Sequence, residues 1–243
     1  MINIYEDMDV LGLAAAELFI EKACYSVNCR GRFTVVLAGG ETPRRIYEIL
    51  GKEPFCSRIP WQKVHVFWGD ERYVPSDDFS SNQLMARQSL LDHVPIPKEQ
   101  IHPIVCESTP QQSAEDYEKV IRSVFMGEEP RFDFVFLGLG TDGHTASLFP
   151  NTPVLEERAG LVDHVYVAEK YSYRVTLTVP LINQAATVVF LVTGGNKAHI
   201  VQEVLEGPQD VMRLPSQRIE PHGGNLYWML DQEAGKLLHV KNK

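Results

Sequence analysis

Closely spaced metal ligands are missing from this sequence. Its four cysteines, at positions 24, 29, 56 and 106, form no Cys-x-x-Cys pair, and its eight histidines form no His-x-x-x-His pair. Metal sites built from cysteine and histidine need such spacing, so we expect no metal. Thiols that are few and unpatterned are typical of a reducing compartment, so we expect reduced cysteines in a cytoplasmic protein.

Positive charge is also scarce. The 23 Lys and Arg residues are outnumbered by 32 Asp and Glu, and the net charge is −9. A surface that binds nucleic acid or an anionic membrane needs a basic face, so we expect neither partner. No apolar run approaches the ~20 residues of a membrane-spanning helix, and the first ten residues do not resemble a secretory signal. Because no long apolar surface stripe stands out, we expect a monomer.

What the sequence does contain is a regular alternation of strands and helices. Four apolar runs, at residues 33–38, 64–68, 134–137 and 187–192, are typical of parallel strands that are buried on both faces. Amphipathic segments between them predict helices. We therefore predict an α/β fold, with residues 1–243 forming one three-layer α/β/α domain around a mainly parallel sheet. The other predicted elements are strands at 2–5, 101–105, 164–168, 174–179 and 226–230, and helices at 7–27, 43–50, 82–91, 111–126, 180–185 and 197–205.

The chain is organised around residues 132–150. An apolar run ends there in two glycines, which let the backbone turn sharply before Asp142 and His144. Ligands bind at the carboxyl ends of strands in open α/β sheets, so a carboxylate and an imidazole stand where chemistry is usually done. A helical turn at 145–149 is predicted next. The same pattern also fits an ordinary capped turn with a structural histidine, and this stretch alone leaves both interpretations open.

Three further strand ends carry polar residues toward the same edge of the sheet. Gly39 and Gly40 precede Thr42, a good N-cap, and the free amides of such a helix start favour an anion, usually phosphate. Lys197 follows a second glycine pair at a helix start, where acidic residues are preferred, and a bound anion would explain it. A third strand ends in the charged residues 70–72, which a solvated loop would also explain.

Five ordered motifs carry a family resemblance. They are LAGGETPRRIYEIL, WGDERYVPSDDFSSN, FLGLGTDGHTASLFP, RVTLTVPLIN and VTGGNKA. The set resembles the 6-phosphogluconolactonases of the oxidative pentose phosphate pathway. The resemblance implies a modified Rossmann-like domain, a fold shared with the glucosamine-6-phosphate deaminases. It also implies that a small sugar-phosphate lactone, 6-phospho-D-glucono-1,5-lactone, is hydrolysed to 6-phospho-D-gluconate without any cofactor or metal.

The resemblance also implies roles for single residues. His144 matches the general base of the family, and Asp142 is close enough in sequence to orient His144 or a water molecule. Arg72 matches an arginine of the substrate site, where Arg72 or loop amides would stabilise the oxyanion of the attacked lactone. The residues expected around the substrate and its phosphate are Gly39, Gly40, Thr42, Asp70, Arg174 and Lys197.

Two other functions remain open. Glucosamine-6-phosphate deaminases share the glycine loop and the Asp-Gly-His turn, but they have a glutamate before the proline where this chain has Phe149. They also have Asp-Glu-Tyr where residues 70–72 are Asp-Glu-Arg, so an acid is lost and a cation is gained, which favours the lactonase. A non-catalytic sugar-phosphate sensor would have the same fold without needing His144, but this chain shows no added basic helix-turn-helix segment.

Overall fold

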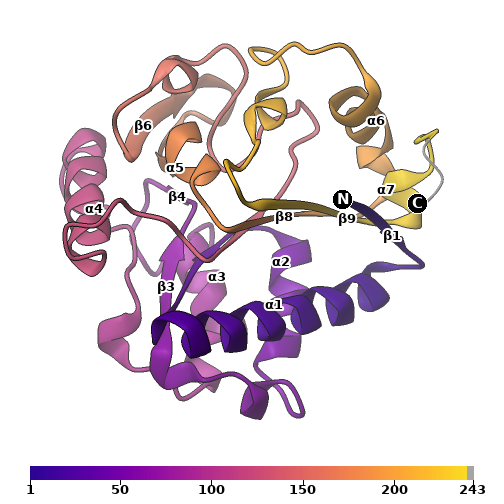
Figure 1. Cartoon of the computed structure of the whole chain (residues 1–243). Coiled ribbons are helices and arrows are strands. Elements are labelled where there is room, and N and C mark those ends of the chain that lie inside the picture. Colours follow the sequence, from indigo (N-terminus) through magenta and orange to yellow (C-terminus); the bar gives the residue numbers. More distant parts are fainter. Residues whose placement is uncertain (240–243) are drawn as a thin grey trace.

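The main sheet consists of six parallel strands (Figure 1). The computed structural model describes residues 1–239, except for the side chain at position 169. In spatial order the strands are β1 (Ile2–Tyr5), β9 (Asn225–Asp231), β8 (Thr187–Val192), β5 (Phe134–Leu137), β2 (Phe33–Leu37) and β3 (Val64–Trp68). From β2 the chain winds outward to β3 and then returns to β5 on the other side. The winding direction therefore reverses between β2 and β5.

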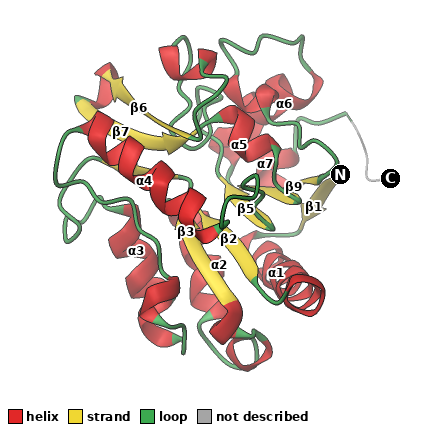
Figure 2. Ribbon diagram, turned by 60° about the vertical axis from the view of Figure 1, so that its left-hand side comes forward, coloured by secondary structure: helices red, strands yellow, loops and turns green. Residues whose placement is uncertain are grey.

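Helices cover both faces of this sheet. They are α1 (Met8–Arg30), α2 (Glu41–Leu50), α3 (Asn82–Ser89), α4 (Pro110–Val124), α5 (Val179–Asn183), α6 (Ala198–Glu206) and α7 (Gln232–Gly235). In Figures 1 and 2, α1 and α2 pack together on one face, whereas α5 and α6 lie on the other. The predicted α/β/α layering and the mainly parallel sheet are confirmed.

A smaller antiparallel sheet stands beside the main one. Its strands, in spatial order, are β4 (Asp70–Arg72), β7 (Ser172–Leu177) and β6 (Val162–Val167). Backbone hydrogen bonds from Gly69 N to Leu37 O (2.9 Å) and from Leu177 N to Gly69 O (2.8 Å) join it to the end of β2. The charged residues at 70–72 are therefore an edge strand of this second sheet rather than a solvated loop.

The core between α1 and the main sheet is aromatic. Phe19 of α1 packs edge-on against Phe33 of β2 and Phe134 of β5, with 5.2 and 5.8 Å between ring centroids. All three side chains are almost fully buried, and burial contributes roughly 1.5–3 kcal/mol for each. α1 is thus held against the two strands between which the winding direction reverses.

Two buried tyrosines fix the strand ends that lead to the carboxyl edge. The Tyr47 hydroxyl of α2 accepts from Ala38 N and donates to Ala38 O, both at 2.9 Å. The Tyr117 hydroxyl of α4 accepts from Trp68 N at 2.8 Å and donates to Trp68 O at 3.2 Å. A phenol can do both at once, so each tyrosine satisfies the backbone where the strand leaves the sheet. The segments that follow β2 and β3 therefore start from fixed positions.

Two predicted local features are wrong. Residues 101–105 form a single bridge from Ile101 to Val66 instead of a strand, and Pro103 removes a backbone donor that a strand would need. Thr42 does not cap α2, because the helix begins at Glu41 and Gly40 is its N-cap. The Thr42 hydroxyl lies 2.7 Å from the Thr193 hydroxyl instead, and this long-range contact joins the segments that follow β2 and β8.

The predicted helical turn at 145–149 is also wrong. The segment is a tight turn closed by a bridge between Thr145 and Leu148, and Ala146 has a φ of 47°. Ser147 N donates to the Thr176 hydroxyl of β7 at 3.2 Å. The backbone is thus tied to the antiparallel sheet, and this tie replaces the hydrogen bond of a helix.

Candidate active site

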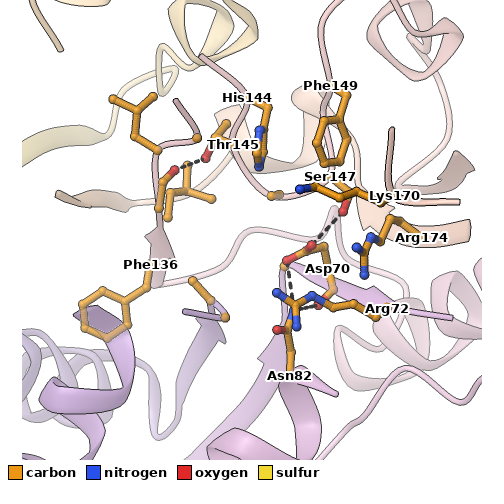
Figure 3. A pocket seen from close by; sticks show the side chains of 18 of the residues that line it. Asp70, Arg72, Asn82, Phe136, His144, Thr145, Ser147, Phe149, Lys170 and Arg174 are labelled. Atoms are coloured by element: carbon orange, nitrogen blue, oxygen red, sulfur yellow. Dashed lines mark hydrogen bonds between the residues drawn. The ribbon is translucent and has the colours of Figure 1, made fainter. Parts of the chain in front are cut away.

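A cavity of about 300 Å³ opens at the carboxyl edge of the main sheet, where segments following β2 and β5 meet (Figure 3). Open α/β sheets bind ligands where the winding direction reverses, and this cavity lies there. Gly40, Thr42 and Asp142 do not line it. The other residues that were predicted from the sequence do line it: Gly39, Asp70, Arg72, His144, Arg174 and Lys197.

His144 and Asp142 form a hydrogen-bonded pair at this cavity. His144 Nδ1 lies 2.5 Å from Asp142 Oδ1, which also accepts from His144 N at 3.2 Å. Burial raises the pKa of Asp142, but hydrogen bonding to His144 and the charge of His144 outweigh burial, so the pKa is lowered on balance. An ionised carboxylate can only accept, so Nδ1 carries a proton, and in the neutral imidazole Nε2 then has the lone pair. The imidazole stacks on the Phe149 ring, 4.1 Å away between centroids.

Gly140 leaves the space that this pair occupies. A Cβ atom on Gly140 would lie 2.1 Å from His144 Nδ1 and 2.5 Å from Asp142 Oδ1. Neither side chain could keep its present position beside an alanine, because real Cβ atoms essentially never come so close to other atoms. Gly140 is therefore required because any larger residue there would displace the side chains of His144 and Asp142.

We expect Gly140→Ala to displace the His144–Asp142 pair, and a displacement of about 1 Å in a catalytic group would lower kcat at least about 10²-fold. The circular dichroism spectrum should match that of the wild type, since the clash is with two side chains at the protein surface. Gly138→Ala is the matched control, because a Cβ there meets no atom within 4 Å, and its loss should be much smaller. Equal losses in both variants would contradict this account.

The turn that carries His144 is fastened to neighbouring segments. The Thr145 hydroxyl donates to Gly138 O at 2.8 Å, which closes the base of the turn. Ser216 N donates to Gly143 O at 3.0 Å, which ties its tip to a loop that follows α6. The histidine is therefore presented by a fixed backbone.

Asp70 is held in the cavity by two neighbours (Figure 3). The Ser147 hydroxyl donates to Asp70 Oδ2 at 2.7 Å, and Asn82 Nδ2 donates to Asp70 O at 2.9 Å and to Oδ1 at 3.3 Å. Gly39 makes this possible, because a Cβ there would lie 2.0 Å from Asn82 Oδ1. The glycine after β2 thus has a steric role in placing the Asp70 carboxylate.

Cationic side chains gather at the cavity although the chain is acidic. Arg72 of β4 stands directly opposite Arg174 of β7, and like charges in that position are destabilising. Burial lowers the pKa of Arg174, the charge of Arg72 lowers it further, and Asp70 and Glu71 raise it. A bound anion would relieve this repulsion, so the arrangement favours an anionic ligand. Four of the described residues that line the cavity are cations: Arg72, Lys170, Arg174 and Lys197.

Lys197 stands on the opposite, main-sheet side of the cavity, just before α6. Its ammonium group donates to Leu139 O at 2.7 Å. Burial lowers the pKa of Lys197, and the charge of Asp142 raises it. The predicted helix starts at Lys197. In the structure α6 starts one residue later, at Ala198, and Lys197 is its N-cap residue.

The start of α2 is open toward an anion. Gly40, its N-cap, has a φ of 110°, which favours glycine, and among the described residues no side chain caps this helix. The first amides of the helix are therefore available to a ligand. Because the Thr42 hydroxyl is hydrogen-bonded to that of Thr193, these amides lie beside the glycine loop that precedes Lys197.

Glu71 points away from the cavity. It is 3% exposed and accepts from the backbone N–H groups of Arg72 (2.7 Å), Asn82 (2.8 Å) and Gln83 (2.7 Å) and from the Ser81 hydroxyl (3.0 Å). Burial raises its pKa, and these hydrogen bonds partly offset that rise. Glu71 therefore joins β4 to the start of α3 and has no contact with the cavity, unlike its neighbours Asp70 and Arg72.

Among the lining residues that were not predicted from the sequence are Asn82, Ser147, Phe149 and Lys170. Ser147 and Phe149 belong to the motif around His144, so their position in the sequence could have indicated them. Asn82 ends the motif that begins at Trp68, but nothing in the sequence shows that it contacts Asp70. Lys170 comes from the connection between β6 and β7 and has no sequence signal, because only the packing of the small sheet brings it to the cavity.

Among the described side chains of residues 1–239, no group of three or more His, Cys, Asp and Glu is placed to hold a metal ion. No helix in the same range is both long and apolar enough to cross a membrane.

Comparisons with known proteins agree with this architecture. The sequence model of the family described as glucosamine-6-phosphate isomerases/6-phosphogluconolactonase matches residues 6–228. A 6-phosphogluconolactonase from Synechocystis sp. is 43% identical over 91% of this chain and 95% of its own length. The human 6-phosphogluconolactonase is 38% identical over 99% of this chain and 94% of its own length. The structure of 6-phosphogluconolactonase from Trypanosoma brucei, 29% identical, superposes with a TM-score of 0.86 over 98% of each chain. The chain therefore belongs to the glucosamine-6-phosphate isomerase/6-phosphogluconolactonase family.

Proposed function

We propose that this protein hydrolyses 6-phospho-D-glucono-1,5-lactone to 6-phospho-D-gluconate, the lactonase step of the oxidative pentose phosphate pathway, with His144 as general base. The chain is an enzyme of the carboxylic ester hydrolase type, as its lactonase relatives are. The observation that carries the proposal is the His144–Asp142 pair at a cavity lined by cations. A water-activating base and an anion site are the two parts that a phosphorylated lactone requires.

The reaction needs one proton carrier. A δ-lactone is an activated ester, so His144 Nε2 takes a proton from water while the water oxygen bonds to the lactone carbonyl carbon. The tetrahedral intermediate collapses, the bond from that carbon to the ring oxygen breaks, and the imidazolium returns its proton to this oxygen as a hydroxyl. Asp142, ionised and hydrogen-bonded to Nδ1, stabilises the imidazolium between the two steps.

The oxyanion needs a donor, and we assign this role to Arg72. Its guanidinium lines the cavity and is held by a hydrogen bond to Ser80 O. Preorganised donors of this kind act strongly because they need no rearrangement as charge develops. Asp70, fixed by Ser147 and Asn82, is placed to accept a hydrogen bond from a sugar hydroxyl group.

The substrate phosphate is assigned to Lys197, Arg174 and the helix start that follows Gly40. The cations supply charge, and the open amides of α2 supply directed donors. Thr42 supports this site indirectly through its contact with Thr193. Fixing the phosphate orients the ring relative to His144, and orientation contributes on the order of 7–11 kcal/mol in favourable systems.

We expect the purified protein to accelerate the opening of freshly generated 6-phosphogluconolactone far above its spontaneous rate. Ammonia release from glucosamine 6-phosphate should be negligible, because Phe149 and Arg72 stand where deaminases have an acid and a tyrosine. A coupled assay that measures 6-phosphogluconate, with the spontaneous rate subtracted, checks the first point, and an ammonia assay checks the second. Comparable rates in both assays would overturn the assignment in favour of a deaminase.

A further inference from the structure

A single peptide group joins Lys197 to His144. The carbonyl of this group is Leu139 O, which accepts from Lys197 Nζ at 2.7 Å. Its N–H belongs to Gly140 and donates to His144 O at 2.8 Å. A peptide group is planar and rigid, and hydrogen bonds in a chain polarise one another. A change in the position of the ammonium group is therefore passed to the backbone of His144 through one rigid unit.

The donors of Lys197 are only partly used by this contact. An ammonium group has three donors, and Leu139 O takes one of them. The side chain is half-buried and lines the cavity. Among the side chains that the structure describes, which exclude position 169, it forms no ion pair with a carboxylate, although the charge of Asp142 acts on it. Burying a cation without a counter-ion is unfavourable. The remaining donors are therefore available to an anion that enters the cavity.

The turn between these two groups leaves little freedom. Gly140 is so close to His144 that a Cβ would lie 2.1 Å from Nδ1. The imidazole is held on its other side by Phe149, with 4.1 Å between ring centroids. A small rotation of the peptide between Leu139 and Gly140 would thus move the imidazole relative to Phe149.

We propose that Lys197 is a positioning residue as well as an anion ligand: when the substrate phosphate binds its ammonium group, the peptide between Leu139 and Gly140 is fixed and His144 is aligned. This inference rests on the proposed lactonase function and extends it. The substrate phosphate then raises the rate of the chemical step at His144, which it does not contact, and also tightens substrate binding. Binding energy from a non-reacting part of a substrate is often used in this way, and truncated substrates then lose kcat.

The test separates the phosphate from the lactone. The assay measures hydrolysis of D-glucono-1,5-lactone, which lacks the phosphate, by the wild type with and without phosphite dianion. Phosphite takes the place of the missing phosphate in the anion site without being bonded to the lactone. We expect saturating phosphite to raise kcat/KM for this lactone at least about fivefold, the lower end of usual coupling between two sites. With 6-phosphogluconolactone, the same phosphite should act only as a competitive inhibitor.

Two variants distinguish coupling from binding. Lys197→Met should abolish the activation even at phosphite concentrations that saturate the site. Lys170→Met removes another cation of the cavity, one for which the structure shows no hydrogen bond to the turn. It should weaken phosphite binding but preserve the activation ratio at saturation. Activation that persists in Lys197→Met would overturn the proposal.

A measurement on the wild type alone covers the case in which Lys197→Met does not fold. The amide signal of Gly140 in a ¹H–¹⁵N NMR spectrum should shift on addition of phosphite and saturate at the concentration that saturates activation. An unmoved Gly140 signal, or phosphite that only inhibits, would overturn the inference while rapid turnover of 6-phosphogluconolactone still supports the proposed function. No turnover of the phosphorylated lactone would overturn the function itself.

Discussion

Replacing His144 with alanine is expected to lower kcat/KM for 6-phosphogluconolactone about 10²–10⁴-fold, the usual contribution of a general base. Among the described residues that line the cavity, His144 is the only histidine. The hydrogen bond from its Nδ1 to Asp142 leaves Nε2 as the nitrogen that can accept a proton. The fold should be retained, because the side chain of His144 is partly exposed to solvent and packs on one ring.

The measurement compares initial rates for the two proteins after subtraction of the spontaneous opening. His93→Ala is the control, because His93 is exposed and lies outside the cavity, and it should keep the wild-type rate. Binding of 6-phosphogluconate to His144→Ala, measured by calorimetry, should persist, since the proposed phosphate ligands remain. Equal turnover by the two proteins would contradict the role of His144 as general base. A wild type that binds 6-phosphogluconate but does not accelerate lactone opening would leave the sugar-phosphate sensor as the better interpretation.

Glu71→Ala is expected to reduce the free energy of unfolding by at least about 3 kcal/mol, because it leaves several buried donors without an acceptor. Those donors are the backbone N–H groups of Arg72, Asn82 and Gln83 and the hydroxyl of Ser81. Activity should fall as well, since Asn82 holds Asp70 and Arg72 follows Glu71 directly.

Urea unfolding of the wild type and variants checks this expectation. Glu71→Gln keeps the size of the side chain but turns an amide donor toward other donors, so it should also be destabilising. Glu128→Ala, at an exposed position, should change stability by no more than about 0.5 kcal/mol. A loss for Glu71→Ala as small as that for Glu128→Ala would show that the buried carboxylate does not hold β4 to α3.

The parallel sheet and the edge that carries the site could be predicted from the sequence. Buried parallel strands are marked by continuous apolar runs, and polar residues after such runs must meet at one edge. That reasoning brought Asp70, His144 and Lys197 together from three segments, and the structure places all three at one cavity. Family resemblance added Arg174, whose position in an antiparallel sheet no apolar run indicates, and it assigned Arg72, already expected at this edge, to the substrate site.

What could not be predicted depends on contacts between distant segments. Thr42 has the properties of an N-cap, but its hydroxyl meets Thr193 in the folded chain. Nothing in the local sequence of residues 145–149 disfavours a helix, but hydrogen bonds of Ser147 to Thr176 and Asp70 hold the segment as a turn. Lys170 reaches the cavity only because β6 and β7 pair with β4. None of these three features can be predicted from local propensity, because each depends on a contact with a distant segment.

The division of the cavity between two sheets has a consequence for how such proteins diversify. The parallel sheet supplies His144 and Lys197, whereas the antiparallel sheet supplies Arg72, Lys170 and Arg174. Substitutions in the connection between β6 and β7, which carries Lys170, can therefore change which ligands are admitted without replacing any residue of the turn that carries His144. Selection, in nature or in the laboratory, can thus alter ligand recognition at this connection while the residues around His144 stay the same.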